Sequence, residues 1–282
     1  MIVDQAHGAH LKFFSKYGMG DFPKAAEEQG ADIVINSIHK TLASWTQSAL
    51  LNVCTERVDL NILEDKLQTL ESSSPSYPMM ATLDISADLL LEKGMNLMCT
   101  WAENLDFFYE EAKKIPGLVI MEEASLDRTK MNIDMSAYGI NGNELEELLM
   151  EKGVFLELVT GNIIMCMSGI GNRRCDYERL IEGLKAIAAE RKLSGKHRMQ
   201  QPEALTEKLE RTELPKEKLY VPIAEAAGRV CATSIIPYPP GVPIACPGEI
   251  LTAEVLEYVK ARRAADEKVI GITADGKVAV GK

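Results

Sequence analysis

The sequence predicts an α/β fold for the first part of the chain, followed by α+β regions. Three observations predict it: short apolar segments near the N-terminus, helical spacing of leucines after residue 60, and a change to strands and short helices after residue 115. Short continuous apolar segments are typical of strands buried on both faces of a mainly parallel sheet. Strands followed by helices are typical of an α+β layer.

Residues 1–115 are predicted to contain three strands and two helical regions. The expected elements are strands at residues 2–3, 31–36 and 49–53 and helices at residues 60–70 and 79–114. The first helix is expected because its leucines fall on one stripe. A loop rich in Ser and Pro, residues 72–78, precedes the second helical region, which we expect to be interrupted near Gly94.

Residues 116–195 are predicted to form a small α+β domain. The expected elements are strands at residues 118–121, 130–134, 154–158 and 162–167 and helices at residues 143–153 and 177–191. The first helix opens with the spacing of a capping box and ends at Gly153, and Asp176 is expected to cap the second. Arg173 and Arg174 are candidates for anion binding, or simply start that helix at the surface.

Residues 196–282 are predicted to form a third region. A polar, charged linker over residues 194–218 leads into it. Beyond the linker we expect a short helix at 223–227, a helix at 252–265 and a strand near 278–280. Between them lies a proline-rich segment, whose fixed backbone leaves a purely structural role open for Cys246 and Glu249.

The composition excludes several classes of protein. The 282 residues carry 42 acidic and 31 basic side chains, a net charge of −11, which argues against nucleic-acid and anionic-membrane partners. No apolar stretch is long enough to span a bilayer, and the N-terminus lacks the features of a signal peptide. Six scattered cysteines without a CxxC motif, and four histidines without paired metal spacing, predict reduced thiols in a cytoplasmic protein and no metal site.

The candidate functional residues lie directly after two predicted buried strands. Asp4 follows the first strand and Lys40 the second, and ligands of open α/β sheets bind beyond the carboxyl ends of such strands. A desolvated Lys is a good nucleophile, and a buried carboxylate needs a partner. Together they match pyridoxal phosphate (PLP), where Lys forms a Schiff base and Asp keeps the pyridine nitrogen protonated. Ser37 and His39 flank Lys40 and are candidate phosphate ligands.

Each of these residues also has an ordinary structural interpretation. A single Asp after a strand is commonly a helix cap or turn former, and a single Lys is commonly a solvated charge. The grouping at two strand ends favours the cofactor interpretation.

Two separate motifs resemble the bacterial ornithine/lysine/arginine decarboxylase family of aspartate-aminotransferase-like (fold type I) PLP enzymes. The N-terminal motif consists of Asp4-Gln5-Ala6-His7-Gly8-Ala9-His10, Ser37-Ile38-His39-Lys40 and Thr46-Gln47-Ser48. The C-terminal motif consists of Tyr238-Pro239-Pro240-Gly241-Val242-Pro243 and Pro247-Gly248-Glu249. The resemblance covers essentially the whole chain and implies the C-terminal part of a PLP-binding large domain (1–115), a small domain (116–195) and a C-terminal decarboxylase domain (196–282).

The resemblance implies PLP-dependent decarboxylation of lysine, arginine or ornithine to its amine and CO2. Lys40 then forms the Schiff base, Asp4 pairs with the pyridine nitrogen, and Ala6 lies against the ring. Ser37 and His39 contact the phosphate or lie beside the reacting carbon.

The roles of other residues near these motifs stay open. His7 is a candidate cofactor ligand, although packing is the simpler interpretation for it and for His10. Ser73 and Ser74 lie in the loop that, in similar enzymes, reaches toward the phosphate of a partner subunit in a homodimer or higher oligomer; an ordinary Ser/Pro turn is the alternative. Glu157, expected within an apolar strand, either binds the distal cation of the substrate or faces solvent.

The start of the chain bears on activity. Met1 is followed at once by an apparent strand, and family members carry a long segment before the Asp motif. We therefore expect an N-terminally truncated chain that binds PLP weakly and turns over poorly or not at all. The alternatives are another fold type I reaction, such as transamination, and a non-catalytic fragment or interaction subunit.

Overall fold

The computed structural model describes residues 1–19, 21–123, 126–194, 205, 208–238, 241–264 and 267–282. Pro239 and Pro240 of the C-terminal motif, and residues 195–204 and 206–207 of the predicted linker, lie outside these described residues. The chain divides into two compact units. The first consists of residues 1–133, 147–157 and 165–194, and the second of residues 134–146, 158–164 and 195–282.

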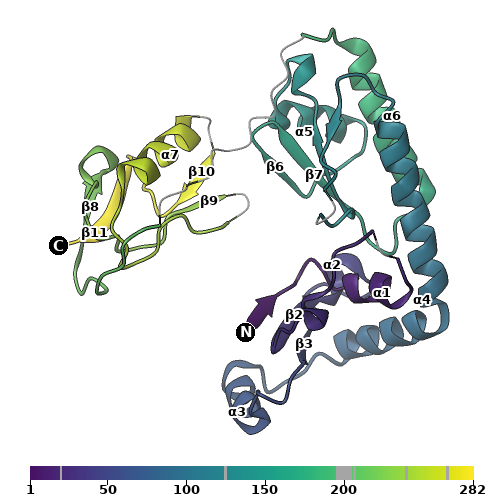
Figure 1. Cartoon of the computed structure of the whole chain (residues 1–282), viewed down its shortest axis with the longest axis horizontal. Helices are drawn as coiled ribbons and strands as arrows, with labels where there is room; N and C mark the ends of the chain where they lie inside the picture. The colour runs from purple at the N-terminus through teal and green to yellow at the C-terminus, as the bar shows by residue number, and fades with distance from the viewer. Residues whose placement is uncertain (20, 124–125, 195–204, 206–207, 239–240, 265–266) are drawn as a thin grey trace. The chain divides into compact units, whose positions relative to one another are not determined.

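The first unit opens with a three-stranded sheet in the order β1-β2-β3 (Figure 1). Its strands are β1 (Ile2–Asp4), β2 (Ile33–Ser37) and β3 (Ala49–Val53). β1 runs parallel to β2, and β3 runs antiparallel to it, so the α/β prediction is confirmed with a mixed sheet.

Burial differs between the central strand and its neighbours. Ile33 and Val34 of β2 point to opposite faces of the sheet and are both buried, as expected for a strand covered on both sides. The expectation is wrong for the outer strands, because Ile2 is 70% exposed and Leu50 is 45% exposed. The described residues therefore cover the centre of the sheet but leave apolar side chains of β1 and β3 open.

The described part of residues 1–115 contains two helices that were predicted and three that were not. The predicted helices are α3 (Leu60–Leu70) and α4 (Tyr77–Ala112), and the others are α1 (Leu11–Lys16), η1 (Ala26–Glu28) and α2 (Ile38–Thr41). The predicted interruption of α4 near Gly94 is wrong, because the helix continues through it, although Figure 1 shows that it bends along its length. A Cβ on Gly94 would lie 2.7 Å from the Tyr17 hydroxyl, so this glycine permits a close contact instead of ending the helix.

A second sheet has four strands in the order β4-β5-β7-β6. They are β4 (Val119–Ile120), β5 (Lys130–Asp134), β6 (Leu158–Thr160) and β7 (Ile163–Met167), and the neighbouring helices are η2 (Ser136–Tyr138), α5 (Gly142–Glu151) and α6 (Arg174–Glu190). Two predictions are corrected. The strand expected over 154–158 begins only at Leu158, and α6 begins three residues before Tyr177, with Asp176 accepting a hydrogen bond from Arg173 N instead of forming the N-cap.

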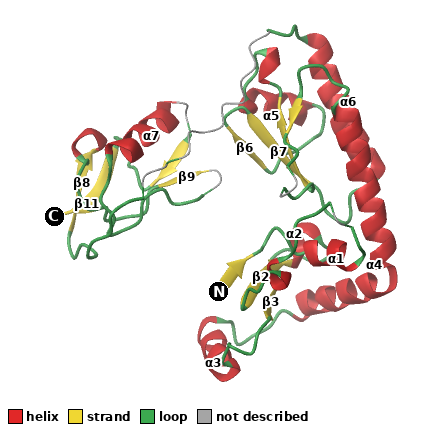
Figure 2. Ribbon diagram, viewed as in Figure 1, coloured by secondary structure: helices red, strands yellow, loops and turns green. Residues whose placement is uncertain are grey.

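Among its described residues, the C-terminal part forms two short antiparallel ladders, a 3-10 helix and an α-helix (Figure 2). β8 (Lys218–Pro222) pairs with β11 (Lys277–Gly281), and β9 (Ile236–Tyr238) pairs with β10 (Lys268–Ile270). η3 (Ile223–Glu225) and α7 (Ala253–Ala264) complete it, at positions close to those predicted. Its core includes the buried side chains of Cys231, Ile235, Leu251, Val255 and Val259.

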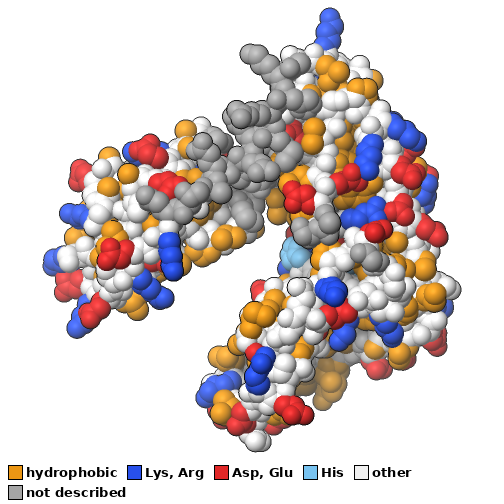
Figure 3. All heavy atoms as spheres, in the orientation of Figure 1, with side chains coloured by type: hydrophobic (Ala, Val, Ile, Leu, Met, Phe, Trp, Pro, Cys, Tyr) orange, Lys and Arg blue, Asp and Glu red, His pale blue; other side chains and the backbone are white. Residues whose placement is uncertain are grey.

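No helix in the described part of the chain is long and apolar enough to cross a bilayer. On the face shown in Figure 3, acidic and basic side chains are interspersed.

Candidate active site

The candidate active site lies at the carboxyl ends of β1 and β2. Asp4 ends β1 and pairs with Ile35 in the ladder, and the main chain continues the pairing because Gln5 N donates to Ile35 O over 2.8 Å. Ser37 ends β2, and the single turn α2 then carries His39 and Lys40. Since β1 and β2 are parallel neighbours, the structure brings the Asp4 and Lys40 segments to the same edge of the sheet.

The Asp4 carboxylate is exposed, not buried as the sequence suggested. Its Oδ1 accepts a hydrogen bond of 3.0 Å from Ala6 N, which closes a tight turn after the strand. Among the described residues its Oδ2 has no hydrogen-bond partner. This oxygen is therefore available as an acceptor.

The α2 turn presents three polar side chains. The Nδ1 of His39 lies 2.9 Å from the Ser48 carbonyl oxygen, which only accepts, so Nδ1 carries the proton and Nε2 is left as an acceptor. The Ser37 hydroxyl makes no capping hydrogen bond to the turn. Lys40 is half-buried, and its Nζ forms no hydrogen bond or ion pair with the described residues.

His7 lies among the charges of this edge. Burial lowers the pKa of His7, and the positive charges of Lys40 and Lys130 lower it further, while Glu157 and Asp4 oppose them. The site thus gathers charged groups from the ends of β1 and β2, from the first residue of β5 and from the segment that precedes β6. Lys130 was not a candidate from the sequence.

Glu157 differs from its predicted surroundings. It precedes β6, its N–H donates to Met165 O over 3.0 Å, and its side chain is exposed, so a charge inside an apolar strand is wrong. Its charge nevertheless acts on both His7 and Lys130. The solvent-facing alternative is therefore correct for exposure, and the carboxylate still lies near the site.

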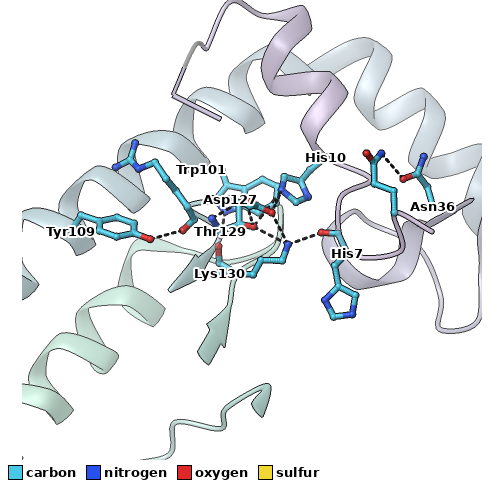
Figure 4. Close-up of polar contacts among 11 residues, drawn as sticks. His7, His10, Asn36, Trp101, Tyr109, Asp127, Thr129 and Lys130 are labelled. Carbon is cyan, nitrogen blue, oxygen red and sulfur yellow. Dashed lines mark hydrogen bonds and ion pairs between the residues drawn. The ribbon is translucent and has the colours of Figure 1, made fainter. Parts of the chain in front are cut away.

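A network that the sequence did not reveal lies behind His7 (Figure 4). The Asp127 carboxylate accepts from His10 Nε2 at 3.0 Å, from Lys130 Nζ at 2.9 Å, and from the N–H and hydroxyl of Thr129 at 3.0 and 2.8 Å. His10 is fully buried, and its ring contacts Trp101 with centroids 5.1 Å apart. The packing role suggested for His10 agrees with this position.

The network fixes the charges of its members. Burial lowers the pKa of His10, so the ring is neutral at pH 7 and donates from Nε2 to Asp127. Burial alone would raise the pKa of Asp127, but the hydrogen bond from His10 and the charge of Lys130 hold it well below its ordinary value. Burial likewise lowers the pKa of Lys130, and Asp127 opposes that shift. The one sequence signal was an Asp and a Lys spaced i, i+3 before an alternating strand, which is also typical of a surface pair.

Ser73 and Ser74 lie in the exposed loop between α3 and α4. The only hydrogen bonds around them in the described chain are local, between Ser72 and Ser74. No contact with Asp4 or Lys40 is present among the described residues, so their role toward a partner subunit stays a prediction.

The side chains at the edge fit PLP in their chemistry. Lys40 supplies an amine without a partner in the described chain, and Asp4 supplies a free carboxylate oxygen for a pyridinium N–H. Ser37 supplies an uncommitted hydroxyl for the phosphate, and Ala6 adds little bulk beside the ring. No group of three or more His, Cys, Asp or Glu side chains suited to a metal lies in the described ranges.

Comparison with known proteins identifies the family of the chain. The model of the Orn/Lys/Arg decarboxylase major domain matches residues 1–118, and that of the Orn/Lys/Arg decarboxylase C-terminal domain matches residues 190–277. The chain is 30% identical over 273 residues to an arginine decarboxylase of Bacillus subtilis (strain 168), covering 92% of this chain and 55% of that relative. It is 29% identical over 276 residues to an arginine decarboxylase of Bacillus anthracis, with 92% and 55% covered.

Solved structures share the fold. Lysine decarboxylase A from Pseudomonas aeruginosa superposes with a TM-score of 0.73 at 18% identity, covering all of this chain and 53% of that one. The constitutive lysine decarboxylase of E. coli gives a TM-score of 0.71 at 18% identity, with 100% and 54% covered. The chain therefore spans about half the length of these relatives. Since the two family models together match more than half of the sequence, the chain belongs to the Orn/Lys/Arg decarboxylase family.

Proposed function

We propose that this chain carries the lysine site of a PLP-dependent decarboxylase that converts a basic amino acid to its amine and CO2. One observation carries the proposal. Asp4 ends β1, Lys40 follows the adjacent parallel strand β2, and Lys40 Nζ has no polar partner among the described residues. Its amine is therefore free to attach a carbonyl compound.

The cofactor, Lys40 and Asp4 have different proposed roles in the reaction. PLP, when bound, supplies the electron sink for the pair released from the Cα–carboxylate bond. Lys40 would hold the cofactor through its amine. Asp4, through its free Oδ2, would accept from the ring N–H and so help to keep the ring protonated.

The overall reaction consumes one proton. The Cα–carboxylate bond breaks, CO2 leaves, and a proton takes its place at Cα. Lys40 Nζ and His39 Nε2 are the candidate carriers, because His39 Nδ1 is committed to the Ser48 carbonyl. The protein's part is therefore orientation and proton transfer.

Two features support a basic substrate. Relatives of this chain are named arginine decarboxylases and lysine decarboxylases. The exposed Glu157 carboxylate lies near His7 and Lys130, and a distal ammonium or guanidinium group is a natural ion-pair partner for it. The proposal covers lysine, arginine and ornithine, and places the product amine in polyamine metabolism in the cytoplasm.

The proposal includes the domain division and the assembly. The proposed boundaries are 1–115, 116–195 and 196–282. A homodimer or higher oligomer with shared sites is supported by large apolar side chains exposed at the start of α4 and along it, namely Tyr77 at 76% and Leu91 at 78%. In such an assembly Ser73 and Ser74 reach the partner's phosphate with their hydroxyls and N–H groups.

The test detects covalent attachment of PLP to Lys40. The purified chain is incubated with PLP, reduced with borohydride and digested, and the peptides are weighed by mass spectrometry. We expect a phosphopyridoxyl label on Lys40 and release of CO2 from at least one of the three amino acids. Lys40→Ala removes both, and Lys66→Ala, at a lysine that is 67% exposed, removes neither. A keto acid in place of CO2 would indicate transamination, and absence of both label and product would indicate a non-catalytic chain.

A further inference from the structure

The main chain between β1 and α1, residues 5–10, is held at three points. At one end, the Gln5 amide donates to Glu27 and Asn36 and accepts from Ala26 N over 2.7–3.0 Å. At the other end, His10 is buried and bonded to Asp127. The middle of the segment, which carries the His7 ring, is held at its carbonyl oxygen.

Lys130 makes the middle contact. Its Nζ donates to His7 O over 2.6 Å, to Asp127 Oδ2 over 2.9 Å and to Thr129 Oγ1 over 3.0 Å. An ammonium group has three donors, so each is committed within the protein. The side chain is 13% exposed. Lys130 therefore has no donor left for a ligand, and its function at this place is to hold the main chain.

Asp127, which accepts from Lys130, is itself held by several other contacts. Asp127 is itself fixed by both donors of Thr129 and by His10. The His10 ring contacts the rings of Phe14 and Trp101 in the core. A buried ammonium is tolerated only where it is paired and hydrogen-bonded. The network meets that condition and connects the position of His7 to packed aromatic side chains.

Figure 4 shows how the contact orients His7. The His7 carbonyl is directed toward Lys130, and the imidazole ring is directed away from it. Fixing the carbonyl therefore fixes the direction from which the ring leaves the main chain. The charges of Lys130 and Lys40 also act on this ring.

We propose that Lys130 is a positioning residue of the candidate active site, which sets the place of the His7 ring and of the adjacent Ala6 relative to Lys40. The inference rests on the proposed function in one respect only, that this edge of the sheet takes PLP. The hold on His7 is a property of the protein chain alone. It can therefore be tested with and without the cofactor.

The first measurement is an NMR titration of the histidines without PLP. The chain has four histidines, and His7→Gln assigns the His7 ring signal. In Lys130→Met we expect the His7 signal to move and its titration midpoint to rise, because a nearby positive charge is removed. Lys130→Arg keeps the charge and the donors, and we expect the midpoint to return to the wild-type value.

The second measurement is the PLP concentration that labels half of Lys40 after borohydride reduction. In Lys130→Met we expect this concentration to rise roughly tenfold, the effect of losing one charge-assisted hydrogen bond. Lys113→Met is the matched control, because Lys113 is 58% exposed and pairs with Glu122 at the surface. We expect wild-type labelling for it.

A further variant separates positioning from folding. Lys130→Met leaves Asp127 buried without its cation, whereas Asp127→Asn with Lys130→Met removes both charges and preserves the fold. An unchanged His7 midpoint in both would overturn the inference, as would wild-type labelling of Lys40 in both. If the wild-type chain takes no label on Lys40, the proposed function fails, and the titration of His7 still decides whether Lys130 positions it.

Discussion

The Asp127 carboxylate is a polar group of the first unit whose removal should cost substantial stability. Asp127→Ala removes the acceptor of contacts from His10, Thr129 and Lys130, each at 3.0 Å or less. Lys130 then remains buried with two neutral acceptors, His7 O and Thr129 Oγ1. The loss is therefore that of a partner from a buried ion pair, not that of a surface charge.

The magnitude follows from burial. Removing one partner of a fully buried ion pair costs about 3–5 kcal/mol. Asp127 and Lys130 retain 18% and 13% exposure, so water can partly replace the lost contact, and we expect about 2–4 kcal/mol. With an m-value of about 2 kcal/mol/M in urea, the midpoint of unfolding falls by roughly 1–2 M.

The assay uses a tryptophan that already lies in the network. The chain has two tryptophans, of which Trp101 is 1% exposed and Trp45 is 61% exposed. In a Trp45→Phe background, fluorescence reports the surroundings of Trp101 alone. Asp65→Ala is the control, because Asp65 and Lys66 form an ion pair that is exposed on both sides, and we expect no measurable change. Equal midpoints for Asp127→Ala and the control would refute the reasoning.

Three further outcomes are expected. Burial lowers the pKa of His10 below 6.5, so the folded state loses stability as the pH falls through that value. The urea concentration at the midpoint of unfolding should therefore fall between pH 7 and pH 5 in the wild type. In His10→Asn, which lacks this titrating group, it should fall less steeply. Gly271→Ala should lower the free energy of unfolding by about 2–4 kcal/mol, because φ is +89° and a Cβ would lie 2.1 Å from the main-chain oxygen of Ser234. Gly228→Ala, where φ is +76° but no atom lies near the new Cβ, should lower it by about 1 kcal/mol in the same urea experiment. Iodoacetamide should label exposed Cys175 in the native protein but not Cys166, whose pKa burial raises to about 12; equal labelling by mass spectrometry would contradict the burial.

The elements near the N-terminus could be predicted because their signals are local. The apolar segments at residues 31–36 and 49–53 match β2 and β3 closely, and the leucine stripe matches α3. The position of Lys40 after β2 and of Asp4 after β1 followed from the same pattern, since a strand end is visible in a single sequence. Two family motifs added the nature of the site.

Other features could not be read locally. Gly94 looked like a helix break, but it lies inside the continuous helix α4. A glycine is needed there because a Cβ would lie 2.7 Å from the Tyr17 hydroxyl. Glu157 looked like a buried charge within a strand, but it lies just before β6 and its side chain is exposed. A sequence pattern shows which residues are apolar, and it does not show whether a neighbouring segment covers them.

The sequence by itself predicted the strands β2 and β3, the long helices α3 and α4, and the two residues, Asp4 and Lys40, that define the candidate site. Only the tertiary structure decided what holds the site in place. Lys130 and the carbonyl of His7 are 123 residues apart, and no local periodicity relates them. Their contact exists because the fold brings the start of β5 beside the segment that follows β1. A buried ammonium there is stable only with the acceptors that His7, Asp127 and Thr129 provide.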